Sequence, residues 1–64
     1  MKELEVVKLK PNVSSSNLVN WKEGVIIHIY HQWDEAVVEA LNHDTGKFCR
    51  FVEYLNNLRH AYEE

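Results

Sequence analysis

A glycine followed by a run of β-branched residues is the feature that most constrains how this chain folds. The run Gly24–Tyr30 reads GVIIHIY, and a second apolar run over Ala36–Leu41 precedes the turn sequence Asp44-Thr45-Gly46. β-Branched residues favour strands, and a glycine-containing turn between two apolar runs favours a hairpin. This order predicts consecutive antiparallel strands, so the expected fold class is mainly β.

Four strands can be placed from alternation and from turn residues. They are expected at Glu3–Lys10, Gly24–Gln32, Glu35–Leu41 and Lys47–Val52. Pro11 ends the first strand, because proline cannot donate to a ladder. The segment Asn12–Asn20 is rich in serine and asparagine, which predicts a loop, with one helical turn at Ser16–Val19 as an option. Gly46 is expected to supply the positive φ of the hairpin turn.

The faces of the strands can be assigned from their period of two. In the second strand we expect Val25, Ile27, Ile29 and His31 on the core face. In the third strand, Ala36/Val38/Ala40 is preferred over Val37/Glu39/Leu41, because the latter set would bury an unpaired carboxylate. Phe48 and Phe51 are expected to fill much of the core.

The C-terminal segment is compatible with two structures. Its apolar residues recur at nearly helical spacing, and neither glycine nor proline interrupts them, which favours a helix over Val52–Tyr62. The alternative is a one-turn helix at Glu53–Asn57 followed by a fifth strand at Leu58–Ala61. Both remain open at this point.

The size of the chain predicts one domain over residues 1–64. A core this small contributes only about 3–5 kcal/mol of stability, so a homo-oligomer or a permanent partner is expected. Cys49 is the only cysteine, which argues for a reducing compartment. The charged start Met1–Glu5 does not resemble a signal peptide, and no apolar run is long enough to cross a bilayer. We therefore expect a cytoplasmic protein without a membrane span.

The charge balance disfavours nucleic acid as a partner. Seven Lys and Arg stand against ten Asp and Glu, for a formal net charge of −3. Affinity for DNA or RNA comes largely from cations placed on phosphates. A nucleic-acid-binding barrel is nevertheless the alternative hypothesis, and its phosphate contacts would be Lys8, Lys10, Lys47, Arg50 and Arg59.

The chain resembles a family of small uncharacterised prokaryotic SH3-like barrel proteins. The resemblance rests on the opening ELEVVKL of Glu3–Leu9, on Gly24–Tyr30, on VEAL of Val38–Leu41, on Asp44-Thr45-Gly46 and on Leu58-Arg59. It covers most of the chain. Two positions depart from the family pattern, because Trp21 replaces a loop glycine and Glu23 an apolar loop residue.

This resemblance implies a small SH3-like antiparallel barrel of four to five strands. It transfers no activity, because such barrels serve as accessory subunits, as interaction modules and as nucleic-acid readers. Fold alone does not decide among these functions.

The histidines and the cysteine do not form a recognisable catalytic or metal-binding motif. His28 and His31 are three residues apart, and on a strand this spacing sends them to opposite faces. Cys49 has no neighbouring base that would favour its thiolate. We expect no catalytic residue, cofactor or bound metal, and an enzyme built on His28, His31 and Cys49 ranks last.

The aromatic side chains carry the functional prediction. Trp21, Tyr30, Trp33, Tyr54 and Tyr62 are too many rings for one small core. Tryptophan and tyrosine are enriched at protein interfaces. The predicted partner-binding residues are Trp33, Tyr30, Asp34 and Trp21. The predicted function is a non-enzymatic protein-interaction module, an accessory or regulatory subunit such as the neutralising partner of a two-protein system.

Overall fold

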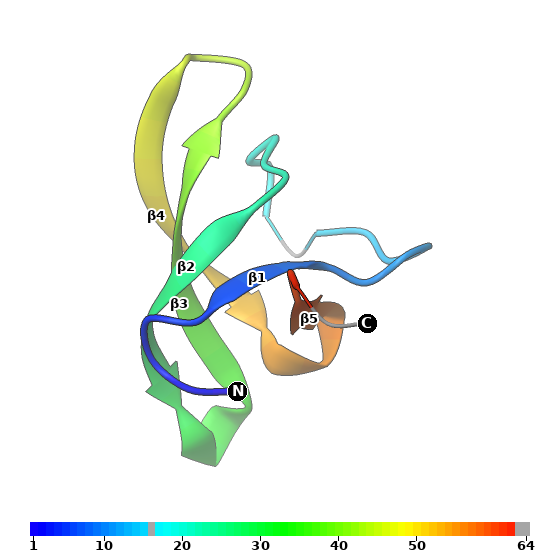
Figure 1. The fold of residues 1–64 in the computed structure, drawn as a ribbon, viewed down its shortest axis with the longest axis vertical. Coiled ribbons are helices and arrows are strands. Elements are labelled where there is room, and N and C mark those ends of the chain that lie inside the picture. Colours follow the sequence, from blue (N-terminus) through cyan, green and yellow to red (C-terminus); the bar gives the residue numbers. More distant parts are fainter. Residues whose placement is uncertain (16, 63–64) are drawn as a thin grey trace.

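The chain forms a small antiparallel sheet, shown in Figure 1 in a computed structural model that describes residues 1–15 and 17–62. The strands are β1 (Val6–Leu9), β2 (Gly24–Tyr30), β3 (Glu35–Asn42), β4 (Lys47–Tyr54) and β5 (Leu58–His60). Two single-turn 3-10 helices, η1 (His31–Trp33) and η2 (Leu55–Asn57), follow β2 and β4. The mainly β fold class is confirmed.

The five strands make one open sheet in the order β4-β3-β2-β1-β5, and each pair is antiparallel. The expected closed barrel is not formed, because β4 and β5 stand at opposite edges of the sheet. The edge of β4 meets the long loop instead of a strand: the Asn17 side-chain amide donates to the Val52 carbonyl at 3.2 Å. β5 has only three residues, and it pairs with β1 alone.

The C-terminal helix over Val52–Tyr62 is not formed either. β4 continues to Tyr54, and η2 turns the chain so that β5 can pair with β1. Leu58 lies opposite Leu9 and is buried, so tertiary pairing outweighs the local helical spacing. The alternative of a helical turn followed by a strand is the one that the structure adopts.

The first strand is shorter than Glu3–Lys10. Leu4 has a positive φ of 66°, which extended strands do not adopt, so regular pairing starts only at Val6. The backbone of residues 4 and 5 still bonds to β2. Leu4 N–H donates to the Ile26 carbonyl, and Ile26 N–H donates to the Glu5 carbonyl.

The register of β3 is as expected. Ala36, Val38 and Ala40 are buried and define what we call the inner face of the sheet. Val37 and Glu39 alternate with them and lie on the outer face, where Glu39 forms an ion pair with Arg50 at 3.6 Å. The preference for leaving the Glu39 carboxylate out of the core is confirmed.

The register of β2 corrects the prediction for Val25 and Ile27. Ile26 pairs with Val38 while His28 pairs with Val37, so the extra residue forms a β-bulge at Ile27. Ile26 and Ile29 are therefore both buried on the inner face although they are three residues apart. A strict period of two could not place both of them there. The expectation for His31 is also wrong, because the strand ends at Tyr30 and His31 is exposed in η1.

The core lies between the inner face and the long loop that connects β1 to β2. Its buried apolar side chains are Val7, Trp21, Ile26, Ile29, Ala36, Val38, Ala40, Phe51 and Leu58. The expectation that Phe48 joins Phe51 in the core is wrong, because Phe48 is 72% exposed. Phe51 pairs with Val38 on the inner face, whereas Phe48 pairs with Leu41 on the outer face.

A buried carboxylate attaches the long loop to the sheet. Glu53 is fully buried, and its Oε2 accepts hydrogen bonds from the Ser15 hydroxyl at 2.7 Å and from the Asn17 amide at 3.3 Å. Its Oε1 accepts from Tyr54 N–H at 3.3 Å and from the Asn57 amide at 3.1 Å. Such donors offset the cost of burying the group.

Of the helical turn considered at 16–19, the first residue lies outside the described residues, and residues 17–19 are not helical.

The two glycines have different structural roles. Gly46 has a φ of +73° in the β3–β4 turn, as expected. Gly24 is required for packing, because a Cβ atom there would lie 2.6 Å from Cγ1 of Val38. The glycine that opens the β-branched run thus lets β2 approach β3 closely.

Candidate partner-binding surface

Three aromatic side chains form a continuous row where β2 ends. The His28 and Tyr30 rings meet edge to face with centroids 4.7 Å apart, and the Tyr30 and Trp33 rings lie 5.4 Å apart. We call these three side chains the aromatic row. Trp33 is 62% exposed, whereas Tyr30 is half-buried beneath its neighbours. The row therefore presents a large indole ring to solvent on an aromatic support.

Backbone geometry explains why the Trp33 ring points outward. Asp34 adopts the left-handed conformation, with φ 52° and ψ 41°, and ends η1. Aspartate tolerates this region better than most residues do. The Asp34 carbonyl accepts a 2.8 Å hydrogen bond from Leu55 N–H, so the β2–β3 connection is tied to the start of η2. Asp34 thus fixes the position of the ring through its backbone.

The other end of the row contacts the N-terminal segment. The Nδ1 atom of His28 lies 3.2 Å from a carboxylate oxygen of Glu3, and both side chains are about half exposed. Exposed pairs of this kind contribute roughly 0–1 kcal/mol. The contact orients the imidazole beside Tyr30 more than it stabilises the fold.

Tyr54 extends this surface across the sheet, although it was not among the predicted partner-binding residues. In the register of the outer face, Tyr30 lies opposite Glu35, and Glu35 lies opposite Tyr54. Tyr54 is about half exposed. The register of β4 could have identified it, but the helical spacing of the C-terminal segment concealed that register.

Trp21 is placed apart from the other three predicted partner-binding residues. Its ring packs on Phe51 with centroids 5.2 Å apart, and it is buried in the core. Its Nε1 atom is buried and has no hydrogen-bond partner among residues 1–15 and 17–62. The structure brings Trp33, Tyr30 and Asp34 together, whereas Trp21 belongs to the long loop and packs in the core.

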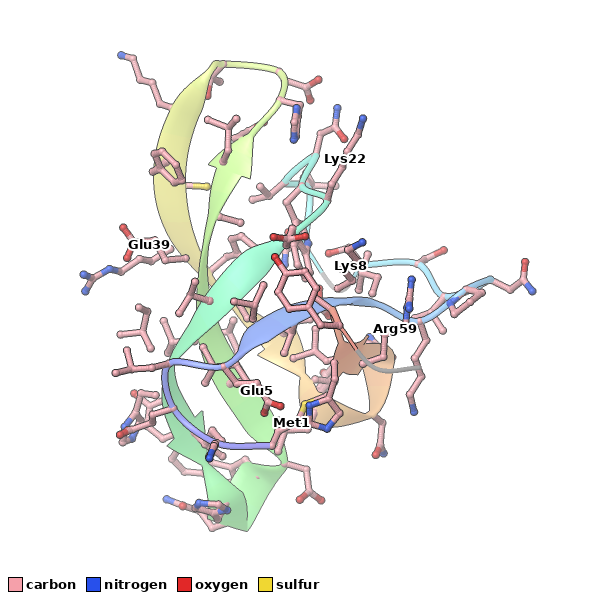
Figure 2. The ribbon with its side chains drawn as sticks, viewed as in Figure 1. Met1, Glu5, Lys8, Lys22, Glu39 and Arg59 are labelled. Carbon is pink, nitrogen blue, oxygen red and sulfur yellow. The ribbon has the colours of Figure 1, made fainter. Side chains whose placement is uncertain are left out.

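The cations of the nucleic-acid hypothesis do not form one patch. Lys8 and Arg59 are opposite each other in the β1–β5 pair, and Lys10 N–H bonds to the Asn57 carbonyl nearby. Lys47 and Arg50 belong to β4, at the other edge of the sheet. Figure 2 shows Lys8 and Arg59 on the side of the molecule away from Glu39, the ion-pair partner of Arg50.

His28 and His31 do not diverge as the odd spacing predicts. The strand ends at Tyr30, and His31 starts η1, so both histidines line one shallow hollow together with Met1, Lys2 and Glu3. Cys49 is half-buried against the core, on the opposite face from His28. Within the described residues, no three His, Cys, Asp or Glu side chains form a group that could hold a metal ion.

No protein-family model matches the chain, and neither a curated protein nor a solved structure matches it. The resemblance to SH3-like barrel proteins therefore stays a prediction. In the part of the chain that the structure describes, no helix is long and apolar enough to cross a membrane.

Proposed function

We propose that the chain is a non-enzymatic protein-interaction module of the cytoplasm, an accessory or regulatory subunit that binds a protein partner through the aromatic row. We further propose that its open sheet is a variant of the SH3-like barrel, on the basis of the strand number and order and of the sequence motifs. The observation that carries the functional proposal is the exposed Trp33 ring supported by Tyr30.

Two physical arguments favour Trp33 as a binding residue: the binding energy of a tryptophan ring, and the fact that this ring is already held in place. Interfaces concentrate their energy on a few residues, among which tryptophan, tyrosine and arginine are enriched. A ring that is already held in place loses little conformational entropy on binding. Trp33 meets this condition, because Tyr30 supports its ring and the Asp34–Leu55 hydrogen bond holds its backbone.

A regulatory subunit of a two-protein system fits this description, because such a subunit needs a binding surface and no catalytic groups. A nucleic-acid reader is supported less, because its five proposed cations are divided between the two edges of the sheet. Nucleic-acid binding is therefore one of the results that the experiments below can distinguish.

The test is quantitative capture from a lysate of the native host. The immobilised wild-type chain is compared with Trp33→Ala and with Leu18→Ala, a matched loss of a fully exposed apolar side chain in the long loop. We expect at least one protein whose recovery falls more than tenfold with Trp33→Ala and is unchanged with Leu18→Ala. Equal recovery with both variants would contradict the proposal.

A second experiment distinguishes the nucleic-acid-binding hypothesis from the protein-binding hypothesis. The wild-type chain is applied to immobilised heparin and to a labelled oligonucleotide at rising salt concentration. Binding through five phosphate contacts would weaken steeply with salt. We expect weak retention that Trp33→Ala leaves unchanged, and tight, salt-steep binding would favour the nucleic-acid reader.

A further inference from the structure

The outer face of the β3–β4 hairpin is unusually apolar for a surface. Phe48, Val52 and Tyr54 project from β4, and all three are exposed. Leu4, Val25, Ile27, Glu39 and Phe48 line a hollow of about 410 Å³ on the same face. Figure 1 shows β3 and β4 as a long hairpin whose turn extends away from β1 and β5. Contiguous exposed apolar patches mark interaction sites.

The register of the hairpin gives this face a particular pattern. The outer-face pairs are Glu35 with Tyr54, Val37 with Val52, Glu39 with Arg50, and Leu41 with Phe48. Each pair therefore combines two groups that suit each other: acceptor with hydroxyl, apolar with apolar, acid with base, and apolar with aromatic. When a second copy is laid over this face so that each residue meets the copy of its cross-strand partner, every contact repeats one of these favourable pairs.

We propose that a second copy of the chain covers this face, in a dimer whose two-fold axis runs parallel to the strands between β3 and β4. This rotation places β3 over the β4 of the second copy. Each residue then lies over the copy of its own cross-strand partner. Glu39 faces the second copy's Arg50, and Leu41 faces the second copy's Phe48.

The charges select this axis over its neighbours. An axis along β3 would stack Glu39 on the second copy's Glu39, which is repulsive. An axis between β2 and β3 would place Glu39 over the second copy's Val25, because these residues are opposite each other in the β2–β3 register. Of these three axes, the one between β3 and β4 is the one that places both charges over opposite charges.

Size and shape are compatible with such a dimer. Two sheets that pack face to face lie about 10 Å apart with their strands within about 30° of each other. Phe48 of one copy would then lie above Leu41, at the border of the hollow that the other copy's Val25 and Glu39 line. A standard interface buries about 800 Å² per partner, which is under a fifth of the 4522 Å² that one chain exposes.

The proposed dimer does not depend on the proposed partner binding. If both hold, the dimer determines where the two Trp33 rings lie. A rotation about an axis parallel to the strands keeps each residue at the same height along them. The two Trp33 rings, which follow the ends of the two β2 strands, would therefore lie at the same end of the dimer. Two partner-binding surfaces would face one side.

The experiment is sedimentation equilibrium of the full chain over a range of concentrations. The wild type is expected to dimerise reversibly. Arg50→Glu alone and Glu39→Arg alone each place like charges opposite one another, so each is expected to weaken dimerisation at least tenfold. An equimolar mixture of these two variants restores both opposite-charge contacts, and a heterodimer of near wild-type affinity is expected.

The mixture separates contacts between copies from contacts within a copy. Mixing cannot repair the Glu39–Arg50 pair inside either chain, so recovery on mixing reports the interface alone. Phe48→Ser, with Leu18→Ser as its matched control, gives the same answer if a charge variant fails to fold. Only Phe48→Ser should abolish the dimer. A wild type that is monomeric up to ~1 mM, or a mixture that stays monomeric, would overturn the proposal.

Discussion

The Ser15 hydroxyl donates a 2.7 Å hydrogen bond to the buried carboxylate of Glu53. The bond joins residues 38 positions apart and attaches the long loop to the end of β4. Trp21 belongs to the same loop and packs in the core, so the position of the loop and the packing of the core depend on each other.

The Glu53 carboxylate is expected to be worth more to stability than any exposed acid. Among the described residues, two groups donate hydrogen bonds to each of its oxygens. Glu53→Gln replaces one oxygen with an amide that must face two donors, which leaves buried donors unpaired. We expect a loss of about 1–3 kcal/mol in the free energy of unfolding, measured by urea denaturation. Glu23→Gln, which changes an exposed carboxylate beside Lys8, is the control and should cost less than about 1 kcal/mol. Equal losses would contradict this role.

Gly24→Ala is expected to destabilise the chain through a clash. The new Cβ would lie 2.6 Å from Cγ1 of Val38, so β2 and β3 must shift or Val38 must change its rotamer. Overpacking of this kind typically costs about 1–3 kcal/mol. Because Val38→Ala removes the clashing atom, the double variant should cost less than the sum of the two single variants. Additive losses would show that the contact is not responsible.

The two tryptophans are expected to respond oppositely to truncation. Trp21 is buried against Phe51, so Trp21→Ala should cost about 3–5 kcal/mol and could unfold a domain of this size. Trp33→Ala removes an exposed ring and should leave the midpoint of thermal unfolding nearly unchanged. Circular dichroism melts of both variants provide the measurement. Unfolding of Trp33→Ala would make that residue structural and remove it from the proposed site.

Removal of metal ions is expected to leave stability unchanged. His28 and His31 share a hollow with Glu3, but these side chains do not form a metal-holding group within the described residues. Addition of EDTA should therefore not shift the thermal midpoint. A drop that zinc reverses would show that the histidines converge on a metal.

Local patterns predicted much of the sheet. Alternation and the cost of a buried carboxylate correctly assigned the inner face of β3, and Gly46 marked the hairpin turn. Alternation failed in β2, because the bulge at Ile27 shifts the register by one residue. A bulge depends on pairing with β3, which the sequence of β2 alone does not contain.

The C-terminal segment and the buried acid could not be predicted for related reasons. Helical spacing was present there, but pairing of Leu58 with Leu9 decided the structure. The local sequence does not mark Glu53 as buried, since its donors Ser15 and Asn17 are far away in the sequence. For the proposed site, composition and position predicted Trp33 and Tyr30, whose rings lie together in the structure. Tyr54 required the register of β4.

The most direct measurement is the fluorescence of Trp33 in a Trp21→Phe variant, in which it is the only tryptophan. In the isolated chain, we predict emission near that of an indole in water and efficient quenching by acrylamide, because the ring is exposed. Addition of the captured and purified partner should shift the emission to the blue, saturably, and protect the ring from quenching. Truncation of such an anchor costs about 2 kcal/mol or more, so Trp33→Ala should weaken affinity about 30-fold. Blue-shifted, quencher-resistant emission in the isolated chain, or emission that does not respond to the bound partner, would contradict a binding site at Trp33.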